Sequence, residues 1–202
     1  CPDTQCDTHF CVPGPAGTPF NPNCDGTTPI EPPPDVCNPF ICRTPGFWGN
    51  HPAITEDFLN VSVCGVTINN VLAGSGTSAI EAICSVGRDG QILGPQLTQL
   101  VRQCTAAALN IASSAEGGGN CSTQFLDLDD TMTACCSMDS VCTGADPDGF
   151  TVNSCIERLD AFNNSIDTLP PFGPFVTPGP ADSSVCRDSR NNGVVVMPVP
   201  QP

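Results

Sequence analysis

The chain has 202 residues, of which 39% are apolar, so it can bury a modest core in one domain with or without extended arms. Its 21 acidic residues face six Arg and no Lys, and the formal charge is -15. Nucleic acid and anionic membrane surfaces are therefore excluded as expected partners. No run of about 18 apolar residues is present, so the sequence predicts no transmembrane segment.

The cysteine content predicts an oxidising compartment. Fifteen Cys in 202 residues, with no repeated zinc-type pairs, indicate a disulfide-rich protein that is extracellular or on the cell surface. The chain opens at Cys1 without a basic and apolar leader, which we interpret as a mature chain whose signal peptide has been removed.

We expect seven disulfides, with the adjacent Cys135 and Cys136 bonded to different partners. The odd count leaves one Cys over, and Cys1 is the candidate for a bond to a neighbouring molecule or for a lipid. The spacing does not determine the pairing. The disulfide candidates are Cys6, Cys11, Cys24, Cys37, Cys42, Cys64, Cys84, Cys104, Cys121, Cys135, Cys136, Cys142, Cys155 and Cys186.

Composition divides the chain into three parts. Residues 1–45 are rich in Cys and Pro, which predicts an extended, disulfide-stapled N-terminal arm. Residues 46–168 carry helical periodicity and form the expected core domain. Residues 169–202 are Pro-rich again and form a C-terminal arm ending in a strand. The predicted fold is mainly α, a small disulfide-rich helical bundle with two arms.

Four amphipathic helices are expected in the core, each with Cys on its buried face. Ser78 with Glu81, and Ser154 with Glu157, have the spacing of capping boxes. The β-branched alternation of "VSVCGVTIN", residues 61–69, predicts a strand or hairpin. The helical stretches are residues 77–86, 96–114 (with Leu97, Leu100, Val101, Cys104, Ala108 and Ile111 inward), 122–138 (Phe125, Leu128, Met132, Cys135, Cys136) and 153–166 (Ile156, Leu159, Phe162, Ile166).

The C-terminal end contains a candidate subunit contact. Asn192-Gly193 is a turn signal, and the Val-rich run after it predicts a strand without a partner in a helical bundle. Such a strand can pair with a sheet edge on another copy. The contact residues are Val194, Val195, Val196, Met197 and Val199.

The stretch "CRTPGFWGNHPAITEDF", residues 42–58, concentrates chemistry-bearing residues: Cys42, the only Trp (Trp48) and His51. A metal site is one interpretation, with Asp57 or His9 as further ligands, but no HExxH, HxH or CxxC spacing supports it. The interpretation we favour is structural: Trp48 anchors the core and His51 bonds the backbone, both buried where the arm meets the core. Thr55, followed by two acidic residues, is read as a helix N-cap.

Three segments together resemble a family of secreted bacterial domains opened by a Gly-aromatic-Trp-Lys-Asn-His-Pro motif. They are "TPGFWGNHP" (44–52), "AAALNIASSA" (106–115) and "LDAFNNS" (159–165). The resemblance implies an exported, surface-associated module. This chain departs from it at Gly49, where the family has Lys, and in its added cysteines.

The sequence contains three further motifs that could bind a cation or carry a glycan. "GADPDGF", with Asp146 and Asp148, lacks the remaining ligands of a calcium loop and predicts a turn. Asp127 and Asp130 are expected on a solvated helix face, where they could bind a cation weakly. Three sequons make Asn60, Asn120 and Asn163 candidates for glycosylation.

No nucleophile elbow, phosphate-binding loop or haem-attachment motif is present, so we expect no enzyme and no cofactor. The leading hypothesis is a structural subunit of an extracellular filament or surface assembly, which polymerises with copies of itself through its arms. The alternative is a monomeric secreted module that binds a glycan or a cell-surface partner through Trp48 and the arm Phe residues.

Overall fold

The computed structural model describes residues 42–72, 74–84, 95–116, 127–165 and 180–192. These residues form a mainly helical, disulfide-bonded core with one small hairpin, which confirms the predicted fold class. Residues 1–41 and 193–202 lie outside the described residues, as do Cys121, Phe125 and Ile166. The candidate Cys residues from Cys1 to Cys37 and the subunit contact predicted between Val194 and Val199 therefore fall outside the description as well.

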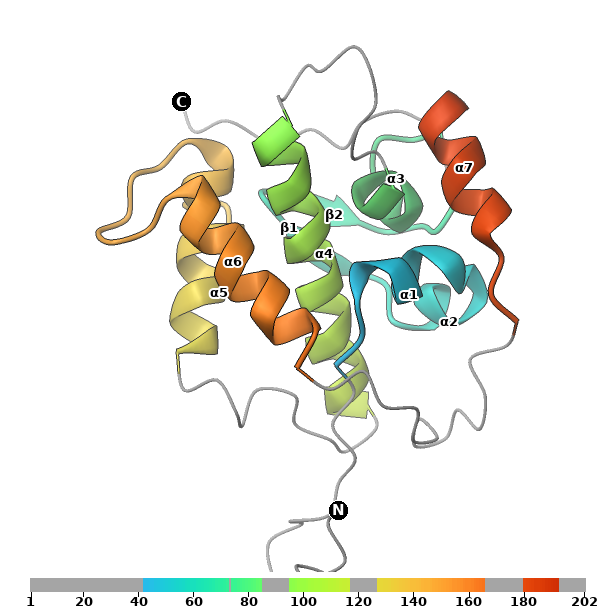
Figure 1. The fold of residues 1–202 in the computed structure, drawn as a ribbon, viewed down its shortest axis with the longest axis horizontal. Helices are drawn as coiled ribbons and strands as arrows, with labels where there is room; N and C mark the ends of the chain where they lie inside the picture. The colour runs from blue at the N-terminus through green and yellow to red at the C-terminus, as the bar shows by residue number, and fades with distance from the viewer. Residues whose placement is uncertain (1–41, 73, 85–94, 117–126, 166–179, 193–202) are drawn as a thin grey trace, which may run out of the picture.

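The long helix α4 (Pro95–Glu116) runs through the middle of the molecule (Figure 1). On one side it packs against α5 and α6, and on the other against α1 and α3. The elements around α4 are α1 (Pro45–Asn50), α2 (Pro52–Asp57), β1 (Val61–Val63), β2 (Val66–Ile68), α3 (Ala79–Cys84), α5 (Leu128–Cys136), the 3-10 helix η3 (Val141–Thr143), α6 (Val152–Asn163) and α7 (Ser183–Asn192).

Helix α4 is buried on more than the single stripe that the sequence predicted. Leu100, Cys104 and Ala107 are fully buried as part of the core, and so is Asn110. A helix with neighbours on two sides buries most of its circumference, and its small residues let those neighbours approach closely. The inward assignment of Ile111 is wrong, since 37% of this residue is exposed.

The hairpin is the one expected between residues 61 and 69. Val61 pairs with Ile68 and Val63 with Val66, which leaves a two-residue turn. Both turn residues, Cys64 (φ 53°) and Gly65 (φ 77°), adopt the left-handed conformation that a tight hairpin turn requires. The Cys64 amide donates to the carbonyl of Cys136 at 2.7 Å and thereby ties the turn to the end of α5.

The capping box predicted between Ser78 and Glu81 forms only in part. The Ser78 hydroxyl does accept from the amide of Glu81, at 3.4 Å. The Glu81 carboxylate, however, is fully buried and accepts from the amides of Gly74 (2.5 Å) and Gly76 (2.9 Å). These two amides compete successfully for the carboxylate because the intervening loop folds back over α3.

The N-cap of helix α6 lies three residues before the predicted one. Thr151 is its N-cap and forms a reciprocal capping box with Ser154 in place of the expected Ser154 and Glu157. Thr55 is also not an N-cap. It lies inside α2, where its hydroxyl bonds the carbonyls of Trp48 (2.8 Å) and His51 (3.0 Å).

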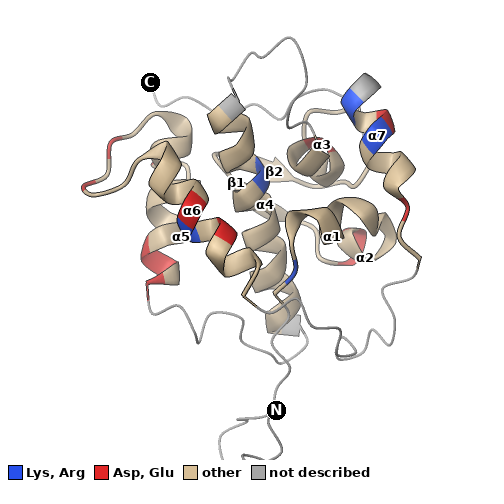
Figure 2. Cartoon of the chain, in the orientation of Figure 1, with Lys and Arg blue, Asp and Glu red and all other residues tan. Residues whose placement is uncertain are grey.

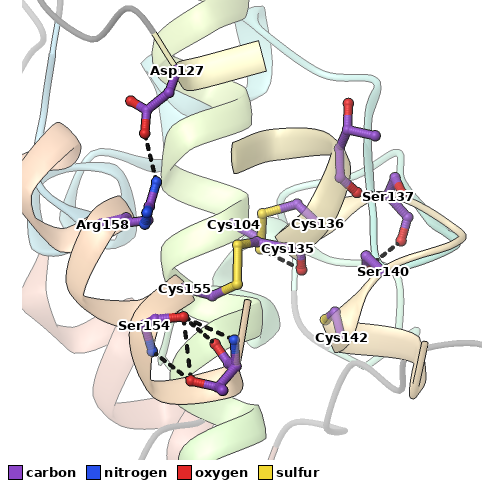
Figure 3. Close-up of a disulfide and its surroundings, with 12 residues drawn as sticks. Cys104, Asp127, Cys135, Cys136, Ser137, Ser140, Cys142, Ser154, Cys155 and Arg158 are labelled. Carbon is purple, nitrogen blue, oxygen red and sulfur yellow. Dashed lines mark hydrogen bonds and ion pairs between the residues drawn. A yellow bond between two sulfur atoms is a disulfide. The ribbon is translucent and has the colours of Figure 1, made fainter. Parts of the chain in front are cut away.

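Four disulfides join described residues: Cys64–Cys142, Cys84–Cys186, Cys104–Cys136 and Cys135–Cys155. Cys42 is also disulfide-bonded. The different partners expected for Cys135 and Cys136 are confirmed, and Figure 3 shows their two bonds side by side between α4, α5 and α6. Each sulfur of these two bonds is buried.

Helix α7 lies in the stretch that the sequence assigned to the C-terminal arm. It packs against α3 and α1 (Figure 1), so the packed core extends beyond residue 168. The Cys84–Cys186 bond holds it, and Arg190 donates from Nε to the carbonyl of Cys84 at 3.1 Å. At its start, hydrogen bonds from the Ser184 hydroxyl and then the Ser184 amide lower the pKa of exposed Asp182.

No helix among these described segments combines the length and the hydropathy that crossing a membrane requires.

Candidate functional site

The cluster around Trp48 is built from the first helix of the core. Thr44 caps α1 by accepting from the amide of Phe47, and Pro45 occupies the first turn, where its missing amide is harmless. The helix directs Trp48 inward, and this residue is completely buried. Phe58 contacts the indole edge to face, with ring centroids 5.8 Å apart.

The indole nitrogen of Trp48 donates to Oδ1 of Asn110 at 3.0 Å. The same oxygen accepts from the amide of Arg43 at 2.7 Å. The Asn110 side-chain nitrogen donates to the carbonyl of Arg43 and to Oδ1 of Asn163, both at 2.9 Å. A buried Asn can make four such bonds, and all four are made here. Asn110 therefore clamps both backbone groups of Arg43.

The network continues into α6 and returns to α4. Asn163 donates to the side-chain oxygen of Gln103 at 2.8 Å and to the Gln103 carbonyl at 3.1 Å. Gln103 then donates to Asp160 at 2.7 Å, toward the surface. We call Trp48, Gln103, Asn110 and Asn163 the polar junction. It connects α1, α4 and α6 through buried, satisfied polar groups, an arrangement that specifies one packing of the three helices.

The three segments that carry the family resemblance meet at this junction. Trp48 comes from the first segment, Asn110 from the second and Asn163 from the third. Sequence reasoning singled out Trp48 but missed both Asn residues. The available signal was an Asn inside the otherwise apolar run "AAALNIA".

His51 lies beside the polar junction and is only partly buried, so the expected burial is wrong for this residue. Its ring stacks on Phe47 with centroids 4.3 Å apart, and Nδ1 bonds the carbonyl of Phe47 at 2.8 Å. The expected backbone bond is therefore confirmed. The buried Arg43 guanidinium lies on the same Phe47 ring, 5.2 Å from its centroid.

The metal interpretation of this stretch finds no support in the geometry. Cys42 is committed to a disulfide, and His51 Nδ1 is committed to a carbonyl. His9 lies outside the described residues. Among the residues that the structure does describe, no three His, Cys, Asp or Glu side chains come close enough to hold a metal ion.

Gly49 packs closely against the disulfide that holds α7. A Cβ atom at this position would lie 3.0 Å from the sulfurs of Cys84 and Cys186 and 3.0 Å from Ile83. The disulfide that holds α7 thus occupies the space that any side chain would need. A side chain here fits only if the disulfide and Ile83 shift by a few tenths of an ångström.

The two acidic segments considered for cation binding, around Asp148 and around Asp127, are both described by the structure. Phe150 donates to the carbonyl of Pro147 at 3.1 Å and Gly149 has φ 80°, so the predicted turn is confirmed. Asp127 forms an ion pair with Arg158 at 2.5 Å, shown in Figure 3. Asp130 is exposed, as expected.

The described charges are dispersed over the surface. Figure 2 shows carboxylates on α2, α5, α6, α7 and the loops, and arginines on α4, α6 and α7. Burial and the nearby Arg190 lower the pKa of Arg102, the arginine on α4.

No family model, no curated protein and no solved structure matches the chain.

Proposed function

We propose that this chain is a structural subunit of an extracellular filament or surface assembly, held together by exchanged arms and disulfides and without enzymatic activity. The observation that carries the proposal is the clamp on Arg43. Asn110 bonds both backbone groups of Arg43, at the end of the N-terminal arm. Trp48, which bonds the same Asn110, is fully buried and cannot contact a substrate.

The N-terminal attachment is rigid. Cys42 is cross-linked, Arg43 is bonded through both of its backbone groups, and α1 begins at Pro45. An arm that contacts a neighbouring subunit can transmit position and force only if its attachment to the core is fixed. A buried, fully hydrogen-bonded clamp supplies such an attachment.

The C-terminal attachment is held in a similar way. The Val-rich segment follows α7 directly, and α7 is fastened by a disulfide and by the Arg190 bond. The two attachments also contact each other, since Asp182 donates to the carbonyl of Asn50 at 2.6 Å, and Gly49 packs on the α7 disulfide. Both arms therefore leave from elements that belong to one cross-linked unit.

The disulfides support an extracellular setting, because such bonds persist outside reducing compartments. The alternative of a monomeric binding module loses its main contact residue, since the fully buried Trp48 cannot stack on a glycan.

The test is the size and shape of the native protein before and after deletion of residues 193–202. We expect fibres by electron microscopy and species far above the 20.9 kDa monomer without reductant. The deleted form should stay folded and lose the fibres, because a head-to-tail contact that does not close generates a filament. A native protein that is monomeric at all concentrations, or a deleted form that builds the same fibres, contradicts the proposal.

A Cys1→Ser variant separates the two kinds of contact. If Cys1 only cross-links subunits that already associate, this variant should still form fibres that dissociate under denaturing, non-reducing conditions. Loss of all fibres in this variant would place the essential contact at Cys1, and the strand would then not be the assembly element.

A further inference from the structure

Two of the three sequons fall on described residues, and their environments are opposite. Asn60-Val61-Ser62 enters strand β1, whereas Asn163-Asn164-Ser165 ends helix α6. The third, at Asn120, lies outside the described residues. An acceptor Asn must present its amide nitrogen, and the Ser two positions later must present its hydroxyl.

The first sequon presents both groups on one outward face. Side chains alternate along an extended strand, so residues two apart point to the same side. Val61 is 7% exposed and belongs to the core, while Asn60 and Ser62 on either side of it are exposed. Neither side chain forms a hydrogen bond with another described residue. Thr67, paired with Ser62 across the hairpin, is exposed as well, so this face is polar and open.

The second sequon is the internal contrast. Asn163 is completely buried, and its side-chain nitrogen is used twice, toward the carbonyl and the side chain of Gln103. The Ser165 hydroxyl donates to the carbonyl of Phe162 at 2.8 Å. A sugar on Asn163 would have to remove this nitrogen from the polar junction, so the folded chain is incompatible with it. The burial and bonding of Asn163 therefore argue against this candidate for glycosylation.

We propose that Asn60 carries an N-linked glycan. In the transfer, the amide nitrogen of Asn60 bonds to C1 of a lipid-pyrophosphate-linked oligosaccharide. The bond between C1 and the phosphate oxygen breaks, the lipid pyrophosphate leaves, and one amide proton passes to a base of the transferase. The glycan then covers the outer face of the β1–β2 hairpin, which removes this face from the surfaces available for subunit contact.

The test is mass spectrometry of the native secreted protein after reduction and cleavage at acidic residues. Cleavage after Asp57 and Glu81 releases residues 58–81, which contain Asn60, and cleavage after Asp160 and Asp167 releases residues 161–167, which contain Asn163. We expect hexose-containing glycan mass on the first fragment, removable by a peptide:N-glycanase, and none on the second. An unmodified first fragment from the native protein overturns the proposal.

Variants produced in the native host separate glycosylation from folding. Asn60→Gln and Ser62→Ala should each lose the glycan completely, while Ser62→Thr keeps it, and all three should retain the four described disulfides because both side chains are exposed. Persistence of the mass in Asn60→Gln would place the modification elsewhere and refute the assignment.

Discussion

Two regions of this core are stabilised by different means. Helices α1, α4 and α6 meet at the polar junction, where buried amides and an indole bond one another across long stretches of sequence. The segment from α5 to η3 instead depends on covalent bonds, with Cys135 and Cys136 tied to α6 and α4, and Cys142 tied to the hairpin.

The difference follows from what each region can bury. α4 is 22 residues long and contacts neighbours on two sides, so it has enough packed surface to fold around a satisfied polar network. α5 has nine residues and η3 only three. Helices this short are marginal alone, and disulfides compensate by restricting the unfolded chain. Hydrogen bonds thus specify the arrangement at one region, and cross-links retain it at the other.

The largest effect is expected from Asn110→Asp at the polar junction. The change replaces both side-chain donors with a carboxylate that faces the carbonyl of Arg43 and Oδ1 of Asn163. We expect the free energy of unfolding to fall by about 3 to 5 kcal/mol, the range for an uncompensated buried charge. Denaturant unfolding followed by the fluorescence of the only Trp measures it.

Ile111→Ala is the matched control on the next residue of α4, which is 37% exposed. It should lower stability by less than about 1 kcal/mol. Equal losses in the two variants would show that the polar junction has no special role.

Removal of a cross-link should have the next largest effect. The Cys135–Cys155 bond spans 20 residues, so the double variant Cys135→Ala/Cys155→Ala should lose about 3 kcal/mol. The loss arises chiefly in the unfolded state, so the Trp48 emission of the folded protein should stay unchanged. An altered native emission spectrum would mean that the two regions are not independent.

Gly49→Ala tests the contact between α1 and the α7 disulfide. Three atoms at 3.0 Å would have to shift to admit a Cβ, and overpacking of this kind costs about 1 to 3 kcal/mol. Gly46→Ala in the same helix is the control, because its Cβ meets only the Thr44 hydroxyl at 3.7 Å. Thermal unfolding of both variants should separate them. If Gly49→Ala is as stable as Gly46→Ala, α7 is not packed against α1 as described.

The smallest effect is expected at the surface ion pair between Asp127 and Arg158, whose side chains are about half exposed. Asp127→Asn should lower stability by less than about 1 kcal/mol, and the difference should shrink as salt is added. Unfolding at low and high ionic strength measures this. A larger, salt-independent loss would show that this pair stabilises α5 as much as the disulfides do.

The sequence predicted the parts whose signals are local. Alternation over residues 61–69 predicted the hairpin, and apolar periodicity predicted α3, α4, α5 and α6. The short helix α1 was missed and α2 was expected to begin only after Thr55, because Pro and Gly obscure their pattern, although Thr44 before Pro45 is a helix-start signal. α7 was missed because its polar sequence, "SSVCRDSRNN", has almost no apolar face, so its packing against α3 and α1 and its disulfide leave little periodic signal.

The polar junction could not be predicted because its hydrogen-bonded partners are 53 to 62 residues apart. A buried Asn and an exposed Asn look alike in one sequence, and only the tertiary contact distinguishes Asn110 and Asn163 from the exposed Asn60. The same reason explains Glu81, whose carboxylate was expected at a helix start and instead binds the loop at Gly74 and Gly76.

Hydrogen exchange of the single indole N–H tests the central claim most directly, because one Trp gives one assigned signal in the NMR spectrum. If Trp48 anchors the core through Asn110, this proton should exchange only when the whole domain unfolds, as slowly as the slowest backbone amides of α4. An indole proton that exchanges within the range of exposed groups, in the oxidised native protein, would contradict the structural role assigned to the polar junction.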